Sequence, residues 1–476
     1  MNKYDLIVVG SSFASTFFLK KYLSKAPSEA KVLVLERGYL YPHAERVKAK
    51  KGEETPFGKI NEDIKKTFIN NTPEKSWNFQ TGFGGSSNCW TGGTPRFLPN
   101  DFKMKSLYGV GADWPIQYED LDSYYTEVEE YMSVSGPEIT PFPKNSKYPQ
   151  PPHLFTDPDK ILHKTYGNLY INQPTVRARI ATNSRNACCV SNVCEVCPVN
   201  AKFTIENSQL EVYEDKRINL VFGAQVIHLN LENDTVKGVV FLKDDKEQQA
   251  FGEVVALGAN AIFNAHILLS SGDKTNLTGR GLGEQVGLQV TVSLKDIKNV
   301  GGSSHINANG YMLYDGAHRS EYAACLMESS NSPFIRMERG KWRNLVSFRM
   351  IFEDLPDNQN FVAISSDRLK PQLNYFGHTD YVSKGIERMK RKLPQILSCL
   401  PVEEIIYKEP FGTESHILGT TRMSDHPEEG VVDKHLIHHQ YRNLFVLGSG
   451  SFTTFTPANP TLTLSALSLF AADKSF

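Results

Sequence analysis

The chain has 476 residues, which is enough for two or three domain-sized cores. Its 53 acidic and 52 basic residues nearly cancel, so the charge balance argues against a nucleic-acid or polyionic partner. The longest apolar runs have the length of a strand and are too short to cross a bilayer. No basic-then-apolar leader precedes the first of them, so we expect a cytoplasmic protein unless a partner carries it elsewhere.

The first forty residues have the pattern of a nucleotide-binding βαβ unit. Residues 5–10 predict a buried parallel strand, 16–23 a helix, and 31–35 a second strand that ends at Glu36. The start of the helix offers unpaired N–H groups to a pyrophosphate, and Glu36 stands where a carboxylate binds ribose hydroxyls. After Gly10, however, Ser12 and Ser15 replace the second and third glycines of Gly-x-Gly-x-x-Gly. Any parallel α/β domain can begin in this way, so the motif alone leaves both interpretations open.

A glycine-rich run, an amphipathic helix and a proline-rich segment follow. The glycines of residues 82–96 allow backbone to lie against a flat ligand, although a flexible surface loop is the alternative. Residues 118–132 predict a helix whose aromatic stripe packs into the core. Six prolines within 137–152 predict an extended connector.

Four cysteines stand close together at Cys188, Cys189, Cys194 and Cys197. Thiolates at this spacing suit an iron–sulfur cluster or zinc. Buried free thiols, or a disulfide in an oxidising compartment, are the alternatives.

The second half predicts further sheet and the end of a ligand site. Strands between 218 and 257 end at a small-residue turn, and a helix follows to residue 270. Residues 290–400 predict an antiparallel sheet with helices on one face, including a helix from Tyr381 that Pro394 kinks or ends. Near the C-terminus, His416 precedes a Gly-Thr turn, and Asn459 precedes a last helix over 461–473.

Taken together, these segments resemble the glucose–methanol–choline (GMC) family of FAD-dependent oxidoreductases. The resemblance rests on the opening βαβ unit, the run 85–96, Asp113-Trp114-Pro115, the run 416–423 and the run 459–461. In its motifs the chain is most similar to pyranose oxidase and to the catalytic subunits of bacterial FAD-dependent sugar and polyol dehydrogenases.

The resemblance implies an α/β fold. We expect a Rossmann-like FAD-binding domain with a parallel sheet, formed by residues 1–100, 185–290 and 405–476. It would be interleaved with an α+β substrate domain built on an antiparallel sheet, formed by residues 101–184 and 291–404.

The resemblance also implies residue roles. His416 would be the base that takes the alcohol proton, and Asn459 would orient the substrate oxygen. His426, His435, His438 and His439 lie among polar residues and are expected to be solvated. The residues expected to contact FAD are Gly10, Ser12, Phe13, Ser15, Glu36, Arg37, Gly84, Gly85, Ser86, Asn88, Cys89, Trp90, Val226, Gly258, Ala259, Gly448, Ser449, Asn459, Pro460 and Thr461.

Two cofactor expectations follow from the comparison with the family. Cys89 stands where pyranose oxidase carries the histidine attached to its flavin, so we expect non-covalent FAD. The four clustered cysteines are similar to those that hold a [3Fe-4S] cluster in some sugar dehydrogenases, although the spacing is one residue shorter. They are therefore candidate ligands for that cluster or for another iron–sulfur cluster.

The function that the resemblance implies is oxidation of an alcohol group on a sugar-like or polyol substrate. Electrons would leave FAD for an acceptor other than oxygen, such as a partner protein, and a small helper subunit would fit this arrangement. The alternatives are an oxygen-using oxidase, a non-redox flavoprotein lyase, and a degenerate protein that binds a metal or a partner through the cysteine loop.

Overall fold

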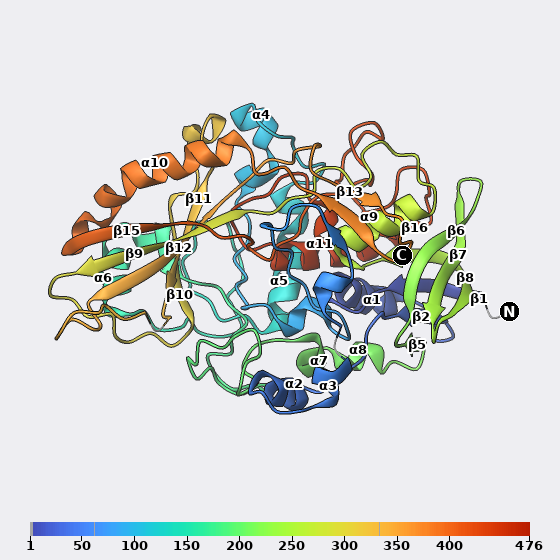
Figure 1. Cartoon of the computed structure of the whole chain (residues 1–476), viewed down its shortest axis with the longest axis horizontal. Helices are drawn as coiled ribbons and strands as arrows, with labels where there is room; N and C mark the ends of the chain where they lie inside the picture. The colour runs from blue at the N-terminus through green and yellow to red at the C-terminus, as the bar shows by residue number, and fades with distance from the viewer. Residues whose placement is uncertain (1–2, 61, 333) are drawn as a thin grey trace.

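The computed structural model describes residues 3–60, 62–332 and 334–476. Two sheets lie toward opposite ends of an elongated molecule, with helices between and around them (Figure 1). In the described chain, no helix has both the length and the apolar character needed to cross a membrane. The helices are α1 (Phe13–Lys25), α2 (His43–Lys50), α3 (Pro56–Ile60), α4 (Met104–Tyr108), α5 (Tyr118–Met132), α6 (Asp157–Tyr166), α7 (Ile205–Ser208), α8 (Leu210–Tyr213), α9 (Asn260–Ser270), α10 (Asp380–Ile396) and α11 (Thr461–Ser475).

A seven-stranded sheet forms one end of the molecule. Its strands are, in order, β5 (Ile218–Val221), β2 (Val32–Leu35), β1 (Lys3–Val9), β8 (Lys246–Leu257), β7 (Thr235–Lys243) and β6 (Gln225–Glu232), with β16 (Leu444–Val446) also paired to β8. β1 runs parallel to both β2 and β8, and Leu6, Ile7 and Val8 are fully buried, as expected for a strand covered on both faces. The antiparallel pairs β6–β7 and β7–β8 make the sheet mixed. The predicted parallel core is confirmed.

The register of this sheet brings three turns together. Val9 pairs with Leu35 on one side and with Leu257 on the other. The residues that follow these strand ends, Gly10, Glu36 and Gly258, therefore lie at one edge, the carboxyl edge at which open parallel sheets bind ligands. Two long helices, α1 and α11, pack against each other beside this edge, and α5 packs on α11 (Figure 1).

A six-stranded antiparallel sheet forms the other end. Its strands are, in order, β15 (Val402–Pro410), β9 (Val286–Leu294), β12 (Leu345–Phe352), β11 (Cys325–Ser330), β10 (Ile306–Leu313) and β4 (Tyr170–Asn172). Helix α10 covers one face and buries Val382, Met389 and Leu393 in the same core as these strands. Pro394 lies inside α10, which continues for only two residues beyond it.

The predicted domain boundaries at 290 and 404 fall inside β9 and β15, both of which belong to the antiparallel sheet. A small third sheet orders β13 (Phe361–Ile364), β14 (Pro371–Asn374) and β3 (Ile69–Asn70), so it joins segments from the two predicted domains. The division into two domains stays a prediction.

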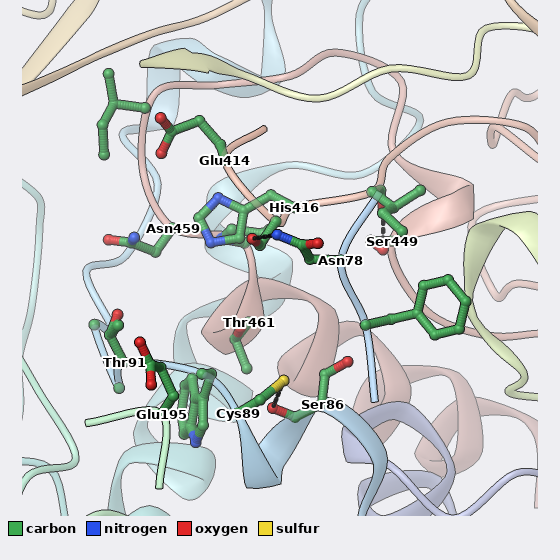
Figure 2. A pocket seen from close by; sticks show the side chains of 18 of the residues that line it. Asn78, Ser86, Cys89, Thr91, Glu195, Glu414, His416, Ser449, Asn459 and Thr461 are labelled. Carbon is green, nitrogen blue, oxygen red and sulfur yellow. Dashed lines mark hydrogen bonds between the residues drawn. The ribbon is translucent and has the colours of Figure 1, made fainter. Parts of the chain in front are cut away.

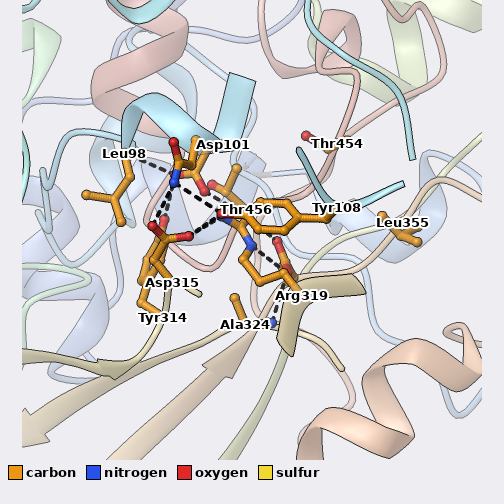
Figure 3. A network of polar contacts seen from close by, with 12 residues as sticks. Leu98, Asp101, Tyr108, Tyr314, Asp315, Arg319, Ala324, Leu355, Thr454 and Thr456 are labelled. Carbon is orange, nitrogen blue, oxygen red and sulfur yellow. Dashed lines mark hydrogen bonds and ion pairs between the residues drawn. The ribbon is translucent and has the colours of Figure 1, made fainter. Parts of the chain in front are cut away.

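A buried polar network ties residues 98–108 to the antiparallel sheet (Figure 3). Arg319 is fully buried and pairs with Glu353 at 2.6 Å and with Asp101 at 2.9 Å. Tyr314 donates to Asp101 at 2.9 Å. Burial raises the pKa of Asp101 to about 6, although the Arg319 charge opposes that rise.

Candidate active site

A cavity of about 710 Å³ lies between the carboxyl edge of the first sheet and the polar face of the second. Segments that are far apart in the sequence line it, among them the start of α1 and strands β11 and β12. Figure 2 shows the glycine-rich loop, the loop around His416 and the start of α11 around the same cavity. The volume is in the range of cofactor and small-molecule sites.

The start of α1 opens onto the cavity without a cap. Ser12, the N-cap residue, makes no side-chain hydrogen bond there, and the first turn of the helix carries no acidic residue. Ser12, Phe13 and Ala14 line the cavity. Unpaired N–H groups and the positive end of the helix dipole suit the pyrophosphate of a dinucleotide.

The turn before α1 is tight where the predicted fingerprint has its first glycine. Gly10 has φ +91°, and a Cβ there would lie 2.6 Å from the carbonyl oxygen of Gly258. At Gly85, which has φ +48°, a Cβ would lie 2.8 Å from the Cβ of Ser12. Ser12 can therefore replace a fingerprint glycine, because Gly85, the residue packed against it, has no side chain.

The structure separates the predicted cofactor residues into two groups. The residues that line the cavity are Ser12, Phe13, Ser86, Cys89, Trp90, Gly258, Gly448, Ser449, Asn459, Pro460 and Thr461. The residues that lie outside its lining are Gly10, Ser15, Glu36, Arg37, Gly84, Gly85, Asn88, Val226 and Ala259.

Glu36 is oriented by its own chain. Its carboxylate accepts hydrogen bonds from the Ser11 hydroxyl at 2.6 Å and from the Gly38 N–H at 2.9 Å. Arg37 pairs with Glu62 at 2.6 Å. Binding of a ribose by Glu36 stays a prediction.

His416 lies half-buried in a loop that its neighbours constrain. Ser415 and Thr420 adopt left-handed backbone conformations, with φ +61° and +83°. The His416 Nδ1 lies 3.0 Å from Oε1 of Gln285, and its backbone N–H donates to Glu284 at 3.1 Å. Burial and the neighbouring Arg349 lower the pKa of His416 to about 3, so the imidazole is neutral at physiological pH.

Asn459 faces the same cavity from the start of α11 (Figure 2). Its Oδ1 is buried and has no hydrogen-bond partner among the described residues. The α11 N-terminus lacks both a side-chain cap and an acidic first-turn residue. A second helix dipole thus places its positive end at the cavity.

Three charged residues that share the cavity with His416 were not predicted from the sequence: Glu328, Arg349 and Glu414. Glu328 and Arg349 face each other across β11 and β12, and Gln289 of β9 is the next residue in the same row. Arg349 also pairs with Glu414 at 2.8 Å. Only Glu414, two residues before His416, lies near a recognised motif; the others are brought to the cavity by strand register.

Glu328 is the buried carboxyl of this group. It is 1% exposed and accepts a hydrogen bond from Gln173 at 2.8 Å. Burial raises the pKa of Glu328 to about 7, while the Arg349 charge opposes that rise. It therefore changes its protonation state near neutral pH.

The cysteine loop borders the site. Cys188, Cys189, Cys194 and Cys197 are free thiols, and Cys189 is exposed whereas Cys194 is buried. Among residues 3–60, 62–332 and 334–476, no group of three or more His, Cys, Asp or Glu side chains is arranged to hold a metal ion. As arranged here, these cysteines do not fit an iron–sulfur cluster.

Of the four histidines expected to be solvated, His438 is fully buried, and that expectation is wrong for it. Its Nε2 lies 3.6 Å from the Asp273 carboxylate, and its Nδ1 accepts from the Gln440 N–H at 3.2 Å. His426 is exposed, and His435 and His439 are half-buried. The polar residues near His438 in sequence turn outward while its ring turns into the core.

Comparison with known proteins agrees with this geometry. The family model described as GMC oxidoreductase matches residues 356–468, which include His416 and Asn459. The fructose dehydrogenase large subunit of Gluconobacter japonicus is 28% identical over 437 residues, covering 82% of this chain and 80% of that protein. The 2-methyl-1,2-propanediol dehydrogenase of Mycolicibacterium austroafricanum is 23% identical over 444 residues, with the same coverage.

Solved structures share the whole fold. Pyridoxine 4-oxidase from Mesorbium loti aligns with a TM-score of 0.64 and 13% identity over 99% of both chains. Formate oxidase aligns with a TM-score of 0.68 and 15% identity, over 99% of this chain and 98% of that one. At these identities the likeness shows the fold.

The family match and the two dehydrogenase relatives together indicate a flavin-dependent oxidoreductase that acts on CH–OH groups. Residues 356–468 match the GMC oxidoreductase family, and this likeness implies FAD as the cofactor. The residues fit that cofactor, since the N-terminus of α1 is uncapped where it meets the cavity. Two glycines keep the wall open: a Cβ added at Gly93 would lie 3.0 Å from Oδ1 of Asn459, and Gly448 has φ +95°.

Proposed function

We propose that this protein oxidises an alcohol group of a sugar-like or polyol substrate, with His416 as the base. The observation that carries the proposal is a neutral imidazole in the wall of the cavity that Asn459 also lines. A neutral imidazole carries a lone pair that can accept the hydroxyl proton.

The chain's residues would divide the work as follows. His416 takes the proton from the substrate hydroxyl, and the Asn459 amide orients the same oxygen. Bound FAD supplies the hydride acceptor at its N5. The α11 N-terminus would stabilise negative charge that develops beside it.

The cavity wall supports a hydroxyl-bearing substrate. Ser330, Ser347 and Gln289 line it from adjacent strands, in addition to Glu328. The only arginine in its described lining, Arg349, is already paired with Glu414. Such a wall can donate to and accept from several hydroxyls, and it offers no unpaired cation to an anionic substrate.

We propose that FAD binds without a covalent link, held at α1, the glycine-rich loop, the 448–449 turn and the start of α11. Cys89 lines the cavity, but burial raises the pKa of its thiol, which favours the unreactive neutral form. Acid precipitation that releases the flavin to the supernatant would support this part of the proposal.

We propose an electron acceptor other than oxygen, since both curated relatives are dehydrogenases by name. One of them is called a large subunit, which supports a partner subunit here as well. The iron–sulfur cluster expected from the cysteine spacing is not proposed, because the four cysteines as arranged do not fit one. The cytoplasmic location also stays a prediction.

The test is anaerobic flavin reduction by a panel of sugars and polyols, with His416→Ala as the variant. We expect a substrate that reduces the wild-type flavin, and a rate about 10²- to 10⁴-fold lower in His416→Ala at unchanged flavin content. A wild-type flavin that no alcohol reduces, or a variant with the wild-type rate, contradicts the proposal.

Added measurements separate the alternatives. Reoxidation of the reduced flavin by oxygen as fast as by an artificial acceptor would indicate an oxidase. Cyanide release from a cyanohydrin panel would indicate a lyase. Failure to retain any flavin would favour a degenerate protein that binds a metal or a partner.

A further inference from the structure

The segment just before β9 lies beside the loop that carries His416. Gly283 and Leu418 exchange two backbone hydrogen bonds, of 3.2 and 2.9 Å. This pairing places Glu284 and Gln285 next to His416. Both side chains are almost completely buried, at 1% and 2% exposed.

The hydrogen bonds of Gln285 define which way its amide points. Its Nε2 lies 2.7 Å from the carbonyl oxygen of Thr456 and 3.0 Å from that of Ala458. Because carbonyl oxygens only accept hydrogen bonds, the NH₂ group must face them. The remaining atom, Oε1, is therefore the one that lies 3.0 Å from His416 Nδ1.

This orientation determines the tautomer of His416. An amide oxygen only accepts, so Nδ1 of the neutral imidazole must carry the proton and donate it to Gln285. Nε2 then carries the free lone pair, and the hydrogen bonds of His416 within the described residues use only its backbone N–H and Nδ1. A base needs such a lone pair toward the substrate.

We propose that Gln285 is a positioning residue that holds His416 with its proton on Nδ1, so that Nε2 accepts the substrate proton. The inference rests on the proposed function, since it concerns the same base. Gln285 also joins the two catalytic loops, because Ala458 directly precedes Asn459.

The neighbouring residue Glu284 fixes the backbone of the same loop. Its Oε2 accepts from the His416 N–H at 3.1 Å and from the Thr413 hydroxyl at 3.1 Å. Its other oxygen pairs with Lys75. Two consecutive side chains therefore hold His416, one by its backbone and one by its ring.

The first test uses Gln285→Leu, which keeps bulk and removes the acceptor. The readouts are the ¹⁵N chemical shifts of His416 in histidine-labelled holoenzyme, and the rate constant of anaerobic flavin reduction. We expect the wild type to show a protonated Nδ1 and a bare Nε2, and the variant to lose that preference. We expect its reduction rate to fall by about 100-fold or more, at little change in substrate Kd.

The matched control is Gln150→Leu. Gln150 is a buried glutamine outside the cavity, and it accepts from the Arg179 and Ile180 N–H groups and donates to Ser133. Its replacement also costs buried hydrogen bonds and should leave the His416 signals and the reduction rate as in the wild type. A similar loss of rate in both variants would reduce the role of Gln285 to general stability and overturn the inference.

Gln285→Glu gives a second test. It keeps an acceptor oxygen at Nδ1, and its second oxygen replaces the NH₂ group that faces the carbonyl oxygens of Thr456 and Ala458. Carbonyl oxygens only accept hydrogen bonds, so the carboxyl is expected to be protonated there and to donate its O–H to one of them. The variant should therefore retain the Nδ1 proton of His416 and reduce flavin faster than Gln285→Leu. A rate as low as that of Gln285→Leu, with the Nδ1 proton still in place, would contradict the inference.

The outcomes separate this inference from the proposed function. If His416→Ala leaves flavin reduction unchanged, the proposed base is wrong. If His416→Ala is inactive but Gln285→Leu keeps both the wild-type tautomer and the wild-type rate, His416 is the base and Gln285 does not position it. Should Gln285→Leu not fold, the His416 ¹⁵N shifts and the reduction rate of Gln285→Glu, compared with the wild type, decide.

Discussion

At the scale of single residues, the site depends on buried groups whose titration its neighbours control. Burial and the nearby Arg349 keep His416 neutral, whereas burial raises the pKa of Glu328 to about 7. Their pKa values are shifted in opposite directions, because burial favours the neutral form of each group, which is the unprotonated base for His416 and the protonated acid for Glu328.

Glu328→Gln tests the carboxyl in the substrate wall. As the pH rises through about 7, Glu328 becomes a carboxylate, and a charged acceptor binds a hydroxyl more strongly than a neutral one. The wild-type KM for a polyol should therefore fall as the pH rises from 6 to 8. Glu328→Gln should lose this dependence and raise KM at pH 8 about tenfold, which corresponds to a loss of about 1.4 kcal/mol of binding free energy.

Glu195→Gln is the control for this prediction, because Glu195 lines the same cavity but is more than half exposed and pairs with Lys50. It should change KM little at either pH. Steady-state assays at fixed ionic strength check both variants, and a wild-type KM that is flat across pH 7 would exclude Glu328 from substrate binding.

At the scale of elements, two helices direct their uncapped N-termini at one cavity, and the glycine-rich loop closes against the first of them. The contact between η2 (Gly85–Asn88) and the start of α1 is tight, since a Cβ at Gly85 would lie 2.9 Å from the Ser12 hydroxyl oxygen. Ser12 thus fits in place of a fingerprint glycine only because Gly85 lies opposite it.

Gly85→Ala should therefore weaken FAD binding. The added methyl group collides with Ser12, so the loop or the helix start must move, and the flavin-to-protein absorbance ratio after gel filtration should fall well below that of the wild type. Ser12→Gly combined with Gly85→Ala should restore part of the flavin, because it removes the collision but not the left-handed strain of about 1 kcal/mol.

Gly109→Ala supplies the matched control. Gly109 has φ +75°, but nothing lies within 4 Å of a Cβ there. It should show the backbone strain without loss of flavin. If Gly85→Ala keeps its full flavin content, the close contact with Ser12 does not govern the cofactor site.

At the scale of the whole molecule, a buried charge network joins the antiparallel sheet to the segment that leads into α5 (Figure 3). Arg319 is its central cation, and Asp101, Glu353 and, more distantly, Asp315 surround it. The acids outnumber the arginine, so its removal leaves buried carboxylates without a counter-charge.

Arg319→Met should lower the free energy of unfolding by about 3–5 kcal/mol. Burial raises the folded-state pKa of Asp101 to about 6. Protonated Asp101 therefore costs the fold little, and the cost of its buried charge grows as the pH rises through that value. The deficit of the variant should therefore be larger at pH 8 than at pH 5. Urea unfolding of the holoenzyme at both pH values measures it.

Arg368→Met is the comparison, because Arg368 forms an exposed pair with Glu247. Its cost should stay within about 1 kcal/mol and vary little with pH. Equal costs for the two variants would show that the buried network contributes no more than a surface ion pair.

The sequence by itself determined the elements with a strong local signal. The apolar run before Gly10, the amphipathic pattern of residues 118–132 and the final helix are all present close to their predicted bounds. The likeness to GMC oxidoreductases, with the FAD cofactor and the CH–OH chemistry that it implies, also followed from short motifs. These features are local because hydrophobic periodicity and turn residues act over a few positions.

Tertiary structure decided what depends on distant segments. Glu328 and Arg349 reach the cavity through the register of β11 and β12, and Gln285 reaches His416 through a backbone pairing across more than a hundred residues. The same holds for His438, whose polar sequence neighbours predicted solvent but whose ring packs in the core. A side chain's surroundings depend on which strand lies beside it, and no short stretch of sequence carries that information.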